Sequence, residues 1–116
     1  MTSHFAVLAI DAVEPAVLAP FWCDVLGWEV IERDEDIVSI GPINGLGPTI
    51  DLLCVPEAKS VKNRLHLDLR PDSSTNQADE VTRLIKLGAR RIEVGQAPDV
   101  TWVVLADPEG NEFCIL

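Results

Sequence analysis

The amino-acid sequence predicts an α+β fold built from two similar βαβββ halves. In each half an apolar, helix-like stretch ends at a Leu-Gly pair, first at Leu26-Gly27 and again at Leu87-Gly88, and a strand-like stretch follows. The turn-forming run from Asp107 to Asn111 lies between two apolar stretches, which predicts a closing antiparallel hairpin. Repetition of this kind indicates two small units of the same plan.

The length of 116 residues corresponds to about one average domain. Two half-sized units of this length cannot each bury an independent core, so we expect them to share one. The sequence therefore predicts a single domain over residues 1–116, with a first module at about 1–56 and a second at about 64–116.

The first module is expected to begin with a strand over residues 5–11. A helix then starts at Glu14-Pro15, because proline is tolerated in a first turn and an acid there suits the helix dipole. Pro20 predicts either a kink or a later start near Leu18, and Gly27 is placed to end the helix. The expected buried stripe of this helix is Val17, Leu18, Phe21, Val25 and Leu26, and the strands expected after it cover residues 28–33, 37–41 and 49–55.

The second module is expected to begin with a strand over residues 64–70, because apolar and polar residues alternate there without a break. Leucines at 65, 67 and 69 would face the core, and Arg64, His66, Asp68 and Arg70 would face the other way. A helix follows, capped by a residue of 71–76. Its expected core residues are Val81, Leu84, Ile85 and Leu87, and the strands expected after it cover residues 91–94, 101–106 and 111–116.

Composition excludes several classes of partner. The formal net charge of −10 disfavours nucleic acid and anionic membranes. Apolar runs stay well short of the roughly 18 residues that a membrane helix needs, and the N-terminus lacks a signal-peptide pattern, so a cytoplasmic protein is expected. Cys23, Cys54 and Cys114 are odd in number and form no CxxC pair, which predicts reduced thiols.

Several segments resemble the vicinal oxygen chelate superfamily, in particular its short glyoxalase-like and bleomycin-resistance-type members. These segments are residues 21–28, 55–57, 62–69, 87–90 and 107–114, and they occur in the order that the family shows. The resemblance implies two βαβββ modules whose curved sheets form an open half-barrel, with helices outside and a small-molecule cleft inside. Fold alone does not establish an activity.

The resemblance also implies where a divalent metal would be bound. The family usually takes one ligand from the first and one from the last strand of each module, and these positions correspond to Val7, Leu53, His66 and Cys114. The first two are aliphatic and cannot bind a metal. Asp51 lies on the same strand face as Leu53 and offers an alternative set with His66 and Cys114. We expect no resident metal, with a divalent ion as the alternative.

The polar face of the strand at 64–70 is the predicted ligand site. His66, Arg64 and Asp68 would bring a titratable base, a cation and a carboxylate into one cleft. The expected ligand-binding residues are Asp51, Arg64, His66, Asp68, Trp102 and Cys114. The alternatives remain open that His66 is a paired structural group, that Cys114 is a small buried hydrophobe, and that the tryptophans pack in the core or a dimer. Lys59, Lys62 and Arg64 are expected to form a solvated basic cluster, with attraction of an anionic ligand towards the cleft as the alternative.

Three functions compete. A metal-free protein that binds or sequesters a small molecule is favoured, because metal ligands are missing while polar cleft residues remain. An enzyme is the alternative, either a lyase, isomerase or dioxygenase with a divalent metal, or one with His66 as its general base. The third is an accessory domain without pocket chemistry. The catalytic residue stays unassigned apart from His66, and a homodimer is expected because short modules leave strand edges to cover.

Overall fold

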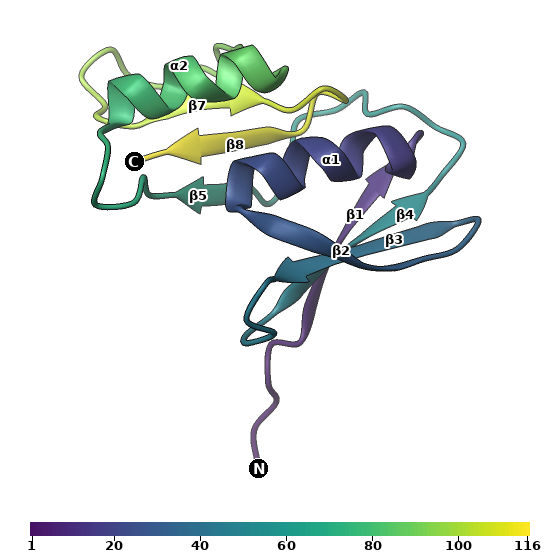
Figure 1. Cartoon of the computed structure of the whole chain (residues 1–116). Coiled ribbons are helices and arrows are strands. Elements are labelled where there is room, and N and C mark those ends of the chain that lie inside the picture. The colour runs from purple at the N-terminus through teal and green to yellow at the C-terminus, as the bar shows by residue number, and fades with distance from the viewer. The chain divides into compact units, whose positions relative to one another are not determined.

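The computed structural model describes all residues, 1–116, and the chain forms two compact units, Met1–Ala58 and Lys59–Leu116. Each unit contains one helix and four strands in the order β-α-β-β-β (Figure 1). The predicted α+β fold of two βαβββ modules is confirmed. Neither helix has the length and apolarity that a membrane crossing requires.

In the first unit one helix packs on a four-stranded mixed sheet. Its sheet has the order β1-β4-β3-β2, in which β1 is parallel to β4 and the other neighbours are antiparallel. The helix α1 contacts β2, β3 and β4, so it covers this sheet. The elements are β1 (Val7–Ala12), α1 (Pro15–Leu26), β2 (Trp28–Arg33), β3 (Ile37–Pro42) and β4 (Thr49–Cys54).

Helix α1 begins at Pro15, so the alternative of a later start near Leu18 is wrong, and the helix continues past Pro20. The Glu14 carbonyl accepts hydrogen bonds from the amides of Val17 and Leu18, which forms the first turn. Pro20 lies inside the helix without ending it, and Gly27 ends it in a left-handed conformation with φ of 66°. The buried stripe differs in part from the prediction, since the side chain of Val17 is 61% exposed. Its buried residues are Pro15, Leu18, Ala19, Phe21, Trp22 and Val25.

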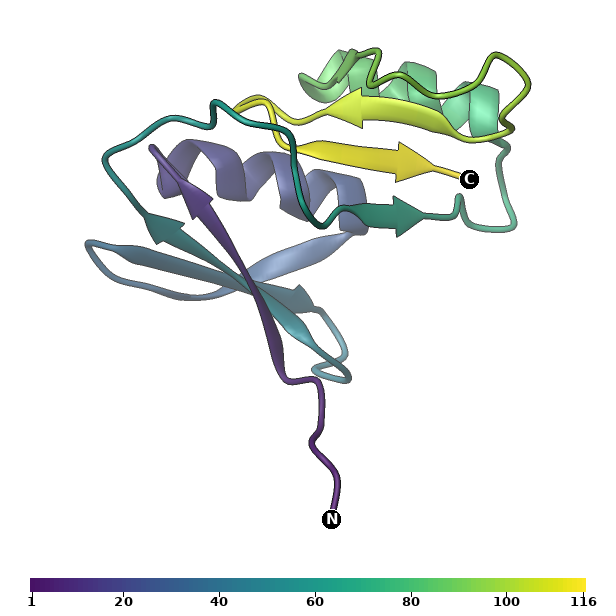
Figure 2. The ribbon, with the colours of Figure 1, turned by 180° about the vertical axis from the view of Figure 1, so that it is seen from behind.

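The second unit repeats the topology of the first. Its sheet has the order β5-β8-β7-β6, with β5 parallel to β8 and the other neighbours antiparallel. In Figures 1 and 2, β7 and β8 run side by side with α2 along them. The elements are β5 (Leu67–Leu69), α2 (Gln77–Leu87), β6 (Arg90–Arg91), β7 (Val103–Ala106) and β8 (Glu112–Ile115).

The strand predicted over 64–70 is shorter in the structure and covers only Leu67–Leu69. The Asn63 side-chain amide donates hydrogen bonds to the carbonyls of Leu65 and Glu112. These side-chain hydrogen bonds replace the backbone–backbone hydrogen bonds that a strand would form there. As a result Leu65 is 80% exposed, and the prediction that it packs in the core is wrong. The leucines at 67 and 69 are only half-buried.

Helix α2 has a well-defined start. The Asn76 side chain accepts a hydrogen bond from the Asp79 amide, which satisfies one of the free N–H groups of the first turn. Val81 and Leu84 are buried as predicted, whereas the prediction that Ile85 packs in the core is wrong, since this residue is 43% exposed. The strands after this helix are shorter than predicted, since β6 contains two residues and β7 begins at Val103.

The closing hairpin is confirmed, and a buried carboxylate organises its turn. Asp107 is fully buried and accepts hydrogen bonds from the backbone amides of Glu109 and Asn111, each at 2.9 Å. The Gly110 amide donates to the Asp107 carbonyl, and Gly110 has a φ of 90°. This turn fixes the register of β7 against β8, in which Val104 is the partner of Cys114.

Candidate ligand groove of the second unit

An open groove of about 360 Å³ lies in the second unit. Part of its lining comes from β7 and β8, part from the segment that leads into β5, and part from the loop between β6 and β7. The lining residues are Lys62, His66, Asp68, Val94, Gly95, Gln96, Trp102, Val104, Glu112, Cys114 and Leu116. The groove therefore combines apolar surface with charged and titratable side chains.

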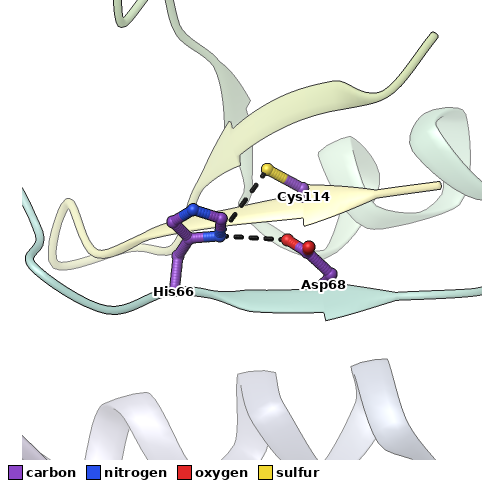
Figure 3. Close-up of side chains that lie close together, drawn as sticks. All are labelled: His66, Asp68 and Cys114. Carbon is purple, nitrogen blue, oxygen red and sulfur yellow. Dashed lines mark hydrogen bonds and ion pairs between the residues drawn. The ribbon is translucent and has the colours of Figure 1, made fainter.

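Three of the polar side chains converge within the groove. The His66 Nδ1 lies 3.0 Å from the Asp68 Oδ1 and 4.0 Å from the Cys114 Sγ (Figure 3). Their positions follow from the sheet, because Asp68 and Cys114 are direct partners in the parallel β5–β8 pair. His66 precedes Asp68 by two residues and so reaches the same side of the sheet.

The contact with Asp68 sets the state of the His66 ring. An ionised carboxylate can only accept a hydrogen bond, so the proton on the neutral ring lies on Nδ1. The other ring nitrogen, Nε2, then carries a lone pair and can accept a hydrogen bond or a proton. Both side chains are about half exposed, which makes them accessible to a ligand.

Cys114 is the buried member of this cluster, with 5% of its surface exposed. Burial raises the pKa of its thiol, and the negative charge of Asp68 raises it further. The thiol is therefore protonated near neutral pH and a weak nucleophile in the free protein. The cluster does not have the arrangement of a nucleophilic triad, because the sulfur and the carboxylate both approach the same ring nitrogen.

A second polar cluster is built around Glu112, whose side chain is only 6% exposed. Its carboxylate accepts hydrogen bonds from the Asn63 amide at 2.7 Å and from Lys62 Nζ at 3.0 Å, and Lys59 Nζ lies 3.2 Å away. Burial alone would raise the pKa of Glu112, but the hydrogen bonds from Asn63, Lys62 and Lys59 outweigh it and lower the pKa to about 2. Glu112 thus holds the 59–63 segment against β8.

The apolar part of the groove includes an accessible aromatic ring. Trp102 is 42% exposed, although tryptophan usually buries most of its large surface. Val94, Val104 and Leu116 add aliphatic surface to the same groove. A half-exposed indole beside aliphatic side chains and polar groups is suited to contact an apolar or aromatic group of a ligand.

The structure brings together four of the six residues predicted for ligand binding. His66, Asp68, Trp102 and Cys114 line the groove. Arg64 is exposed and does not line it. Asp51 lies on β4 of the first unit and accepts a 2.6 Å hydrogen bond from Ser39 Oγ.

Glu112 and Gln96 line the groove but were not predicted as site residues. The contacts of Lys59 and Lys62 with Glu112 were not predicted either. Glu112 precedes Cys114 by two residues on a strand, so the strand period could have placed both on one face. Lys59 and Lys62 were expected to be solvated, but both contact the buried Glu112 carboxylate. Gln96 lies in an irregular loop, where its side chain accepts a hydrogen bond from the Val94 amide, and no periodicity points to it.

Comparison with known proteins agrees with this architecture. Residues 7–116 match the family model described as a glyoxalase-like domain. The comparison with curated proteins finds no match.

Solved structures with the same fold cover almost the whole chain. A glyoxalase/bleomycin resistance protein/dioxygenase family enzyme from Burkholderia phytofirmans is 20% identical, with a TM-score of 0.75 over 97% of each chain. A lactoylglutathione lyase from Agrobacterium tumefaciens is 18% identical, with a TM-score of 0.64 over 98% of this chain and 92% of that one. A bleomycin-binding protein from Streptomyces verticillus, in complex with copper(II)-bleomycin, is 16% identical, with a TM-score of 0.62 over 99% and 96%. With a family model that matches nearly its full length, this chain belongs to the glyoxalase-like domain family of the vicinal oxygen chelate superfamily.

Proposed function

We propose that this protein binds a small molecule in the groove of its second unit. The observation that carries the proposal is the combination of a half-exposed Trp102 with the polar cluster of His66, Asp68 and Cys114 in one groove. Ligand sites are typically concave and mostly apolar, with a few placed polar groups that orient the ligand. This groove has each of these properties.

The dimensions and chemistry of the groove limit the ligand. A volume of about 360 Å³ lies at the lower end of the roughly 300–1,000 Å³ typical of ligand sites. The ligand, or the part of it that enters, is therefore small, with an apolar or aromatic group to contact Trp102. A polar group on it would pair with the His66 Nε2 or with the ammonium group of Lys62, which has 57% of its side chain exposed.

The fold relatives support this class of function. One of them binds bleomycin, which indicates that this fold accommodates ligand sequestration. We propose that binding here needs no metal, because Val7 and Leu53 leave the family's four-ligand set incomplete.

A thermal-shift screen with small hydrophobic and anionic metabolites and metal-free bleomycin, in the presence of chelator, tests the proposal. The best compound is then titrated by calorimetry into wild type and into His66→Ala and His4→Ala, which replace the only two histidines. We expect His66→Ala to weaken binding by about tenfold, the cost of one lost hydrogen bond in a site, and His4→Ala to leave it unchanged. A screen without hits, or equal affinities of both variants, would contradict the proposal.

A second candidate function rests on the 3.0 Å contact between His66 and Asp68. A carboxylate that orients an imidazole and leaves Nε2 free is the usual arrangement of a general base. One fold relative is a lactoylglutathione lyase, so the protein should be assayed for that activity. Activity lost in His66→Ala and reduced in Asp68→Asn would support an enzyme, and its absence from wild type would leave ligand binding as the function.

We also propose that the protein is a homodimer. Strands β1 and β2 are the two edges of the first sheet, and β2 exposes Val30 and Ile31. An exposed apolar edge strand favours association unless another surface covers it. A symmetric pair of chains would provide that cover.

A further inference from the structure

The fold family implies a divalent metal, and the residues of this chain fit it only in part. Of the four positions that would supply ligands, Val7 and Leu53 have no lone pair. The family's usual site, with ligands from both modules, therefore cannot form at these positions. The second unit, however, offers a donor outside the usual set, namely Asp68.

Three donors from the second unit lie close enough to share one ion. The ligand atoms of His66, Asp68 and Cys114 all lie within 4.8 Å of one another, and His66 Nδ1 is 3.0 Å from Asp68 Oδ1 and 4.0 Å from Cys114 Sγ. Bonds of 2.0–2.3 Å to a tetrahedral zinc ion place neighbouring ligand atoms about 3.3–3.8 Å apart. The His66 and Asp68 side chains are about half exposed, and we expect rotation of both side chains to bring the three donors to that spacing.

The backbone already fixes the less mobile part of the cluster. Asp68 and Cys114 are Cα partners in the parallel β5–β8 pair, and Cys114 is buried. Figure 3 shows the Cys114 sulfur and the Asp68 carboxylate both directed towards the His66 ring; the sulfur belongs to a buried residue, whereas the other two donors are about half exposed. Donors on regular strands give a better-defined site than donors on loops.

We propose that His66, Asp68 and Cys114 form a binding site for one thiophilic divalent cation, such as Zn²⁺, within the second unit alone. The donor set decides the ion, because thiolate and imidazole favour zinc and similar ions over magnesium or calcium, which prefer oxygen ligands. Three protein ligands leave a fourth position for water or a ligand group. This inference goes beyond the proposed function, which needs no metal, and departs from the sequence-based expectation of a metal-free protein.

Ion binding changes the protonation of the cluster in a defined way. The Cys114 thiol releases its proton to solvent and binds as thiolate, and His66 gives up its hydrogen bond to Asp68 so that both can bind the ion. The thiolate and the carboxylate together balance the two positive charges. The hydrogen bond between His66 and Asp68 must break before both can bind the ion, and its loss reduces the affinity for the ion. A preformed structural zinc centre does not have this cost.

Cobalt titration tests this site without reference to any activity. Purified protein is dialysed against chelator, freed of it, and titrated with Co²⁺, whose bond to a thiolate gives a ligand-to-metal charge-transfer absorption in the near ultraviolet. We expect this absorption to saturate at one equivalent in wild type and to disappear when Zn²⁺ is added. Cys114→Ser should abolish it, whereas Cys54→Ser, which replaces the exposed cysteine of the first unit, should retain it.

The remaining ligands are tested in the same titration. We expect His66→Ala and Asp68→Asn each to weaken Co²⁺ binding by at least tenfold, while circular dichroism reports an unchanged fold. Absence of the absorption in wild type, its persistence in Cys114→Ser, or wild-type affinity in Asp68→Asn would overturn the proposal. Because the ligand screen is performed with chelator, failure of this site and failure of small-molecule binding are distinguishable.

Discussion

The buried carboxylate of Glu112 accepts a 2.7 Å hydrogen bond from the backbone amide of Asn63, 49 residues earlier in the chain. Lys62 and Lys59 contact the same carboxylate, so one side chain on β8 holds the segment that forms one wall of the groove. Removing the charge of Glu112 leaves the two lysines and the Asn63 amide with a neutral and therefore weaker hydrogen-bond partner.

We therefore expect Glu112→Gln to lower the free energy of unfolding by about 1–3 kcal/mol, the range for a charged hydrogen-bond partner lost from a buried site. Urea denaturation of the variant and of wild type measures the difference. The control is Glu93→Gln, which removes the same charge from an exposed position. Equal losses in the two variants would show that net charge, and not the contact with Asn63, is responsible.

The lowered pKa of Glu112 also predicts a pH dependence. Its pKa falls from 4.5 to about 2 in the folded protein, so the folded state binds its proton less readily than the unfolded state does. The resulting stabilisation is fully present above about pH 4.5 and is lost as the pH falls towards 2. The stability difference between wild type and Glu112→Gln should narrow over that range. A difference that stays constant from pH 6 to pH 2.5 would contradict the assigned shift.

Gly110 has a φ of 90° in the turn that Asp107 organises. A side chain there would have ordinary contacts, with its nearest neighbours 3.8 and 3.9 Å from the added Cβ, so the cost of substitution comes from the backbone conformation. We expect Gly110→Val to destabilise the protein by about 1 kcal/mol or more, and Gly110→Asn by less, because asparagine tolerates positive φ better than valine. Thermal melts check the order, and an unchanged melting temperature in Gly110→Val would contradict the turn assignment.

The proposed homodimer is tested by sedimentation at about 50 μM, a concentration at which even modest interfaces associate. We expect a mass close to twice 12.7 kDa. Ile31→Lys places a charge on the exposed edge strand β2 and should shift the protein towards monomer, whereas Val17→Lys, on the exposed side of α1, should not. A monomer in wild type at this concentration would rule out the dimer.

The fold could be predicted from the sequence because its signals are local. Gly27 and Gly88 end the two helices, and the run from Asp107 to Asn111 forms the closing turn. Leu65 was misplaced because alternation of apolar and polar residues predicts a strand regardless of its hydrogen-bond partners. The Asn63 side chain supplies those partners instead, and nothing in the local pattern reveals it.

The candidate site was predicted only in part, for a related reason. His66 and Cys114 came from the family resemblance, and Asp68 from its place on the same strand face. The third metal donor was sought at Asp51 in the first unit, because Asp51 lies two residues from Leu53 on the same strand face. The structure instead makes Asp68 the partner of Cys114, through the alignment of β5 with β8. Asp68 and Cys114 are 46 residues apart in the chain. Which residues of two such distant strands become partners depends on the tertiary structure, and one sequence does not reveal it.

Nuclear magnetic resonance of the three tryptophan indoles tests the central claim most directly. Trp102 lines the groove, whereas Trp22 is buried in the first unit and Trp28 begins β2 there. On titration with the best compound from the ligand screen, with chelator present, we expect the indole N–H resonance of Trp102 to shift in wild type. At a concentration near the wild-type dissociation constant, the shift in His66→Ala should be only a small fraction of the wild-type shift, as tenfold weaker binding requires. Saturable binding that shifts the indoles of Trp22 or Trp28 and leaves that of Trp102 unchanged would contradict a ligand site in this groove.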